Sequence, residues 1–109
     1  MHARVKLYLA SDTRLFFLEK EVEFAAMPRV SEWVKLKNDE MGDYFPFRIE
    51  EVTHREGGPP EITLGLLTGE DDAPEFAGRE DEFDACVKSY EREGWVLRSS
   101  KPWRGRMGQ

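Results

Sequence analysis

The sequence predicts an α+β domain, in which a mainly antiparallel, curled sheet of five or six strands is packed by one helix in the C-terminal half. Apolar and polar residues alternate in five segments between residues 4 and 66, which is typical of strands with one buried face. Helical spacing of apolar residues follows only in residues 81–93. Strands first and a helix late favour the α+β class. Five short strands can also curl into a small open barrel with the helix plugging one end.

Two strands joined by a short turn are expected at the start of the chain. Val5, Leu7 and Leu9 alternate with more polar residues, which predicts a strand with one apolar face. The letters S-D-T that follow are typical of a turn. Residues 16–24 alternate again, so we expect a hairpin. The outer face of its second strand carries Phe17 and three glutamates. Charged side chains of this kind hinder the pairing of an edge strand with another chain.

Three more strands are expected in the middle of the chain. Residues 33–37 alternate, and a polar loop that contains a glycine follows at residues 38–43. Another strand begins near Phe45, and its apolar phase moves by one residue after Glu50 and Glu51. A phase change of this kind is what a β-bulge produces. The letters G-G-P-P then predict a turn, and the alternating letters I-T-L-G-L predict a return strand.

One helix is expected over residues 81–93, with Asp81 as its N-cap and Gly94 just beyond its end. Its expected buried face consists of Phe83, Cys86, Val87 and Tyr90. Residues 95–97 are expected to form a short last strand or a packed extended segment. This order of elements is similar to that of SH3-like or OB-like barrels at the level of pattern, and no motif assigns the chain to a family.

The composition indicates one small domain. A chain of 109 residues supports a single hydrophobic core, so we expect residues 1–100 to form the domain and residues 101–109 to form a basic tail. Cys86 is the only cysteine, which excludes an internal disulfide and a cysteine-rich zinc site. The N-terminus has no uninterrupted apolar run suited to a signal peptide, and no stretch approaches the roughly 18 apolar residues of a membrane span. A cytoplasmic protein that does not enter a membrane is predicted.

The letters E-E-V-T-H at residues 50–54 pose a question about metal binding. On a helix, Glu50 or Glu51 would converge with His54. On a strand, Glu51 and His54 face opposite ways, whereas Glu50 and His54 lie roughly 13 Å apart at about 3.3 Å per residue. That separation is far too long for one ion with ligand distances near about 2 Å. Strand-forming neighbours and the following G-G-P-P favour the strand, so we expect no metal site here.

The sequence lacks the residue patterns of the common enzyme classes. Cys86 falls on the expected buried face of the helix, where an apolar setting raises the pKa of a thiol and makes it a poor nucleophile. No serine lies in a nucleophile-elbow motif, and no glycine-rich phosphate-binding loop is present. We therefore expect a protein that is not an enzyme and has no cofactor.

Charge is distributed unevenly. Residues 70–84 contain eight acidic residues and one arginine, whereas residues 98–109 contain four basic residues and no acid. The acidic segment is either a solvated loop that leads into a helix, or a docking surface for a basic partner, or a mimic of nucleic-acid charge. The basic tail with Trp103 suits single-stranded nucleic acid, but the acidic body would repel that ligand, so nucleic-acid binding is disfavoured.

The binding hypothesis centres on four consecutive apolar residues at positions 44–47. They cannot all be buried in one sheet unless the helix, a partner or a second copy of the chain covers its other face. The acidic segment follows the strand expected to pair with them, and an apolar centre with a charged rim is the usual anatomy of a binding patch. The predicted partner-binding residues are Tyr44, Phe45, Phe47, Glu70, Asp71, Asp72 and Phe76.

Together these observations predict a small, non-enzymatic binding module. Its expected partner is another protein or a second copy of itself. The alternative is an acidic inhibitor or immunity-type protein that blocks a nucleic-acid-binding partner by charge mimicry.

Overall fold

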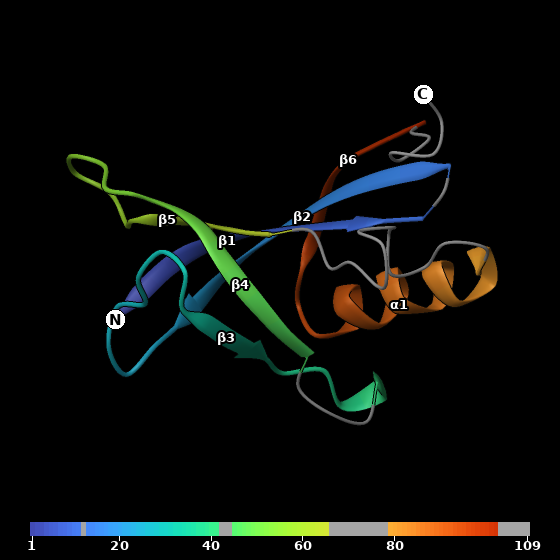
Figure 1. The fold of residues 1–109 in the computed structure, drawn as a ribbon, viewed down its shortest axis with the longest axis horizontal. Helices are drawn as coiled ribbons and strands as arrows, with labels where there is room; N and C mark the ends of the chain where they lie inside the picture. The colour runs from blue at the N-terminus through green and yellow to red at the C-terminus, as the bar shows by residue number, and fades with distance from the viewer. Residues whose placement is uncertain (12, 42–44, 66–78, 103–109) are drawn as a thin grey trace.

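The computed structural model describes residues 1–11, 13–41, 45–65 and 79–102. They form one six-stranded sheet with the strand order β3-β4-β5-β1-β2-β6, together with one α-helix (Figure 1). The elements are β1 (His2–Ala10), β2 (Arg14–Glu23), β3 (Trp33–Leu36), the 3-10 turn η1 (Asp39–Met41), β4 (Phe45–Thr53), β5 (Glu61–Leu64), α1 (Glu80–Arg92) and β6 (Val96–Pro102). Neighbouring strands are antiparallel except β1 and β5, which run parallel.

This arrangement confirms the predicted α+β class with its mainly antiparallel sheet and single late helix. The sheet is twisted and open, and it does not close into a barrel (Figure 1). Within the described residues, β3 and β6 are its two edge strands.

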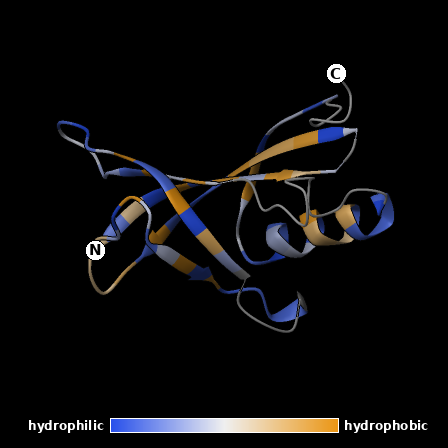
Figure 2. Ribbon diagram, viewed as in Figure 1, coloured by the Kyte–Doolittle hydropathy of each residue, from blue (hydrophilic) through white to orange (hydrophobic). Residues whose placement is uncertain are grey.

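The predicted hairpin is formed by β1 and β2, with Leu7 opposite Leu18 and Tyr8 opposite Phe17. β1 lies between β5 and β2, so both of its edges are paired. Its alternate residues, such as Val5 and Leu7, are fully buried on the face that α1 covers. Figure 2 shows the alternation of hydrophobic and hydrophilic residues along the strands. Burial of this row supplies much of the apolar area that drives folding.

The letters E-E-V-T-H belong to a strand and the residue after it, as expected. β4 continues through Thr53 and pairs with β5, where Glu51 lies opposite Thr63. The register shifts between Ile49 and Glu51, which confirms the predicted bulge. Gly57, in the turn that connects the two strands, has a φ of 75°, a value that glycine adopts without strain.

The helix begins one residue earlier than expected and ends one residue earlier. Asp81 lies inside its first turn, and the N-cap position is occupied by Arg79, which makes no side-chain capping hydrogen bond. Gly94 has a φ of 101°, so the predicted glycine beyond the C-terminus is confirmed. The four predicted face residues are buried, and the ring of Tyr90 packs edge-to-face on Trp95.

The last strand is longer than the sequence indicated. β6 runs antiparallel to β2 as far as Pro102, where Lys101 lies opposite Leu15 and Pro102 opposite Arg14. The start of the predicted basic tail is therefore part of the sheet, because β2 extends far enough to pair with it. Residues 103–109 lie outside the described part of the chain.

Candidate functional site

The predicted docking surface is only partly described. Tyr44, Glu70, Asp71, Asp72 and Phe76 lie outside the described residues, so their part of the hypothesis stays a prediction. Phe45 is the first residue of β4 and lies opposite Leu36.

Phe47 is 1% exposed, so its ring belongs to the core and not to a docking surface. It shares the inward phase of β4 with Ile49 and lies opposite the buried Val34 of β3. A partner cannot reach this ring while the domain is folded, and we remove Phe47 from the candidate site.

The outward-facing aromatic residue of the hairpin is also covered by its own chain. Tyr8 and Phe17 lie opposite each other, and their rings stack with centroids 5.0 Å apart and an interplanar angle of 16°. This pair is on the outer face of the sheet, which we define as the face opposite α1. Cross-strand stacking of this kind stabilises a sheet without any partner.

A polar cluster attaches α1 to the hairpin. Ser11 and Thr13 donate hydrogen bonds from their hydroxyl groups to Oε1 of Glu80. Arg14 donates to Oε2 of Glu80 at 2.7 Å and to Oδ1 of Asp84 at 2.6 Å. The Arg14 guanidinium also lies 4.9 Å from the centroid of the ring of Phe83, a residue of the same helix. Each polar group has a partner within the cluster, so we assign it a structural role.

These bonds lower the pKa of Glu80 to about 2, chiefly through the hydroxyl of Thr13 and the guanidinium of Arg14. A depressed carboxylate pKa stabilises the fold above the ordinary value of 4.5, and this stabilisation is lost as the pH falls from 4.5 to about 2. Because the side chain of Glu80 is 39% exposed, solvent screening reduces its contribution to about 1 kcal/mol.

We therefore expect Glu80→Gln to be less stable than the wild type by about 1 kcal/mol at neutral pH, with a difference that shrinks between pH 4.5 and about 2. Urea unfolding across this pH range measures the difference. Glu82→Gln is the control, because it makes the same charge change in the same helical turn and removes only an exposed pair with Arg79. Equal effects of the two variants at every pH would contradict the role assigned to Glu80.

The described residues present little that suits catalysis or metal binding. Burial raises the pKa of the Cys86 thiol to about 12, so the sulfur stays protonated. Among the described residues, no three His, Cys, Asp or Glu side chains are placed to hold a metal ion. No helix in the described part of the chain is long and apolar enough to cross a membrane.

The most exposed large aromatic side chain of the described residues is at the start of β3. Trp33 is 65% exposed, and Val30, three residues earlier, is 53% exposed. Val34 and Leu36 point into the core, so Trp33 and Lys35 point to the outer face. On that face Trp33 lies directly opposite the exposed Arg48 of β4.

A strained backbone turn leads into this strand. Ser31 has a φ of 73°, a conformation that costs a residue other than glycine about 1–2 kcal/mol. Its N–H donates to the carbonyl of Ile49 at 2.8 Å, and the N–H of Ile49 donates to the carbonyl of Glu32 at 2.9 Å. This is a bulge whose first residue is usually a glycine. Outliers of this kind are concentrated at functional sites, where the surrounding structure holds them in place.

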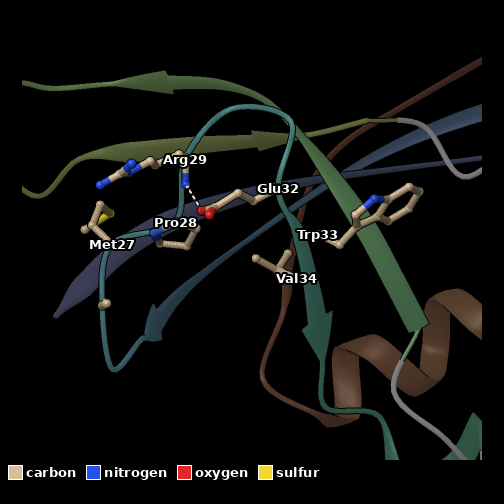
Figure 3. A pocket seen from close by; sticks show the side chains of 7 residues that line it. Met27, Pro28, Arg29, Glu32, Trp33 and Val34 are labelled. Atoms are coloured by element: carbon tan, nitrogen blue, oxygen red, sulfur yellow. Dashed lines mark hydrogen bonds between the residues drawn. The ribbon is translucent and has the colours of Figure 1, made fainter.

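A hollow of about 750 Å³ lies between β3 and the connection that precedes it (Figure 3). It is lined by Ala26, Met27, Pro28, Arg29, Glu32, Trp33 and Val34. No residue of β4 contributes to the lining, so the hollow borders the edge of β3 that faces away from β4. The connection is held over it by a hydrogen bond of 2.6 Å from the N–H of Arg29 to the carboxylate of Glu32. Figure 3 shows the ring of Trp33 pointing away from Met27 and Pro28.

A smaller hollow of about 380 Å³ shares the connection with the first one. Its lining adds Val30, Val52 and His54 to Met27, Pro28 and Arg29. His54 therefore lies beside the exposed Val30 and the half-buried Val52. We define the β3 edge surface as Trp33, Lys35, Arg48, Val30 and the larger hollow.

Sequence reasoning did not single out this surface. In the letters W-V-K-L-K, the tryptophan has the same phase as two lysines, so the alternation itself placed it on the polar face. Comparisons of the chain with protein-family models, with curated proteins and with solved structures found no match.

Proposed function

We propose that this protein is a small, non-enzymatic binding module that docks another protein on the β3 edge surface. The observation that carries the proposal is the exposure of Trp33 beside a hollow and a strained turn. Tryptophan is enriched among the residues that dominate the energy of protein interfaces, because it buries a large area with few rotatable bonds. An exposed tryptophan that no other part of the described chain covers is suited to that role.

We expect Trp33→Ala to weaken partner binding by at least about 2 kcal/mol, or about 30-fold in Kd. The melting temperature should stay close to that of the wild type, because most of the side chain is already in solvent. Val96→Ala is the matched control, since Val96 is 47% exposed on β6, the opposite edge of the sheet.

The measurement is affinity capture from the source cell with the wild type, Trp33→Ala and Val96→Ala as baits, followed by a titration of the captured protein against each of them. Support consists of a partner that binds the wild type and Val96→Ala but not Trp33→Ala. If the same partner binds Trp33→Ala with unchanged affinity, the docking surface lies elsewhere.

The charge-mimicry alternative makes a different prediction. It requires the acidic segment, so substitution of Glu70, Asp71 and Asp72 by their amides would abolish binding while Trp33→Ala would leave it intact. These residues lie outside the described part of the chain. The two sets of variants therefore separate the two functions in one assay.

A further inference from the structure

The edge of β3 away from β4 has hydrogen-bonding groups without a strand to receive them. In an antiparallel ladder, residues alternate between those bonded to the neighbouring strand and those whose N–H and C=O point away from it. Ile49 bonds to Glu32, so the alternation places Trp33 and Lys35 in the second group. Within the described residues, no strand pairs on that side. An extended chain laid along β3 would find two donors and two acceptors at the spacing of a strand.

Three exposed cations lie around this edge. Arg29, Lys35 and Arg48 are exposed and form no ion pair with a carboxylate of the described residues; Arg48 donates only to the Ser31 hydroxyl, at 3.3 Å. Elsewhere in the described residues, carboxylates pair with Arg4, Lys6, Arg14, Lys37, Arg55, Arg79, Arg92 and Arg98. Lys20 donates to the carbonyl of Glu93, and Lys88 and Lys101 have no carboxylate partner within the described residues. These three cations outnumber the carboxylate of Glu32, which lines the hollow beside Trp33, and the net positive charge favours an acidic partner.

We infer that the partner segment is an extended, acidic peptide that adds to the sheet as a further strand along β3. This inference rests on the proposed function, and it states the chemistry of the partner. Backbone hydrogen bonds from Trp33 and Lys35 give such an added strand its affinity, and side chains at alternate positions give it specificity.

The side-chain pattern of the peptide follows from the geometry of the strand. Residues two apart share a face, so an apolar residue beside Trp33 has an acidic residue two positions away beside Lys35, and Arg48 lies one strand further on the same face, across Trp33. The intervening residue points to the other face, where the hollow is lined by Met27, Pro28 and Val34. The expected peptide therefore alternates acidic or aromatic residues on one face with aliphatic residues on the other.

The probe is a fluorescent heptapeptide of the sequence Thr-Glu-Val-Phe-Val-Glu-Thr with both ends blocked, and fluorescence anisotropy measures its Kd. The double variant Lys35→Glu/Arg48→Glu should weaken binding at least about 30-fold, since it reverses the charge of Lys35 beside the peptide and of Arg48 one strand further on the same face. Lys88→Glu is the control, because it reverses an exposed lysine of α1 that also lacks a carboxylate partner within the described residues. Two further peptides carry methyl groups on backbone nitrogens, one on its two valines and the other on Phe and the two Glu residues. The N–H groups of these two sets point to opposite edges of the peptide strand. One of the two methylated peptides should bind at least about 30-fold more weakly than the parent peptide.

Four results would overturn the inference. The first is that the peptide does not bind at millimolar concentration, and the second is that both methylated peptides bind as tightly as the parent peptide. The third is that Lys88→Glu weakens peptide binding as much as the double variant does. The fourth is that a thymidine oligonucleotide binds at the same residues more tightly than the peptide. Sedimentation is the further check, since a dimer that Trp33→Ala dissociates would assign the edge to a second copy of the chain. If the peptide fails while Trp33→Ala still removes the captured partner, the proposed function stands and only the β-strand addition is wrong.

Discussion

Phe83→Ala should destabilise the domain by about 3–5 kcal/mol, the usual cost of removing a fully buried phenylalanine. The ring is 0% exposed, and it packs edge-to-face on Phe16 of β2 with centroids 5.1 Å apart. It also underlies the guanidinium of Arg14, so its loss weakens the polar cluster that attaches α1 to the hairpin. Small domains have about 5–15 kcal/mol of stability in total, so this change would remove a large fraction of it.

Urea denaturation of the wild type, Phe83→Ala and Phe83→Leu measures this effect. The leucine variant keeps most of the apolar volume and should lose much less. An unchanged midpoint for the alanine variant would show that this face of α1 is not in the core, and it would make the face a candidate interface.

Phe47→Ala should cost a similar amount, about 3–5 kcal/mol, because its ring is also enclosed in the core. Phe47 was predicted from the sequence to bind the partner, so this variant separates the two interpretations. A core residue lowers the urea midpoint and leaves the affinity of the remaining folded protein unchanged. A docking residue would lower the affinity and leave the midpoint where it was.

Val96→Ala, measured for the same urea midpoint and partner affinity as Phe47→Ala, controls for general effects of truncating a side chain of the sheet. Val96 lies at an exposed position, and its substitution should alter neither quantity by more than a few tenths of a kcal/mol. If Phe47→Ala retains the stability of the wild type and loses the partner, the core described for β4 is wrong.

Much of the fold was predictable because local patterns of apolar and polar residues specify its elements. Alternation in β1 and β2 defined the hairpin, and a one-residue change of phase located the bulge at Glu50 and Glu51. The helix followed from apolar spacing, and Gly94 followed from the left-handed conformation needed after its last turn.

Other features depend on contacts between distant segments, which a local pattern does not contain. Nothing in the sequence of β6 reveals that β2 extends far enough to pair with Lys101 and Pro102. Asp81 resembled an N-cap, but the helix begins earlier, and Glu80 binds Ser11 and Thr13, which are far away in the chain.

The candidate site was missed for the same reason. Alternation shows that Trp33 and Val34 lie on opposite faces, but only the sheet order shows that their strand is an edge. Likewise, four consecutive apolar letters could not show that Phe47 is enclosed by its own domain. The strained Ser31 has no signal in the sequence, because glycine is the residue usually found at such a position.

Amide hydrogen exchange, measured in the free and in the partner-bound protein, tests whether the edge of β3 receives the partner. In the free protein, the amides of Trp33 and Lys35 point away from β4, and they should exchange faster than those of Val34 and Leu36. We expect the partner to slow exchange at Trp33 and Lys35 by at least about tenfold. Slowing confined to β6, with Trp33 and Lys35 unchanged, would contradict it.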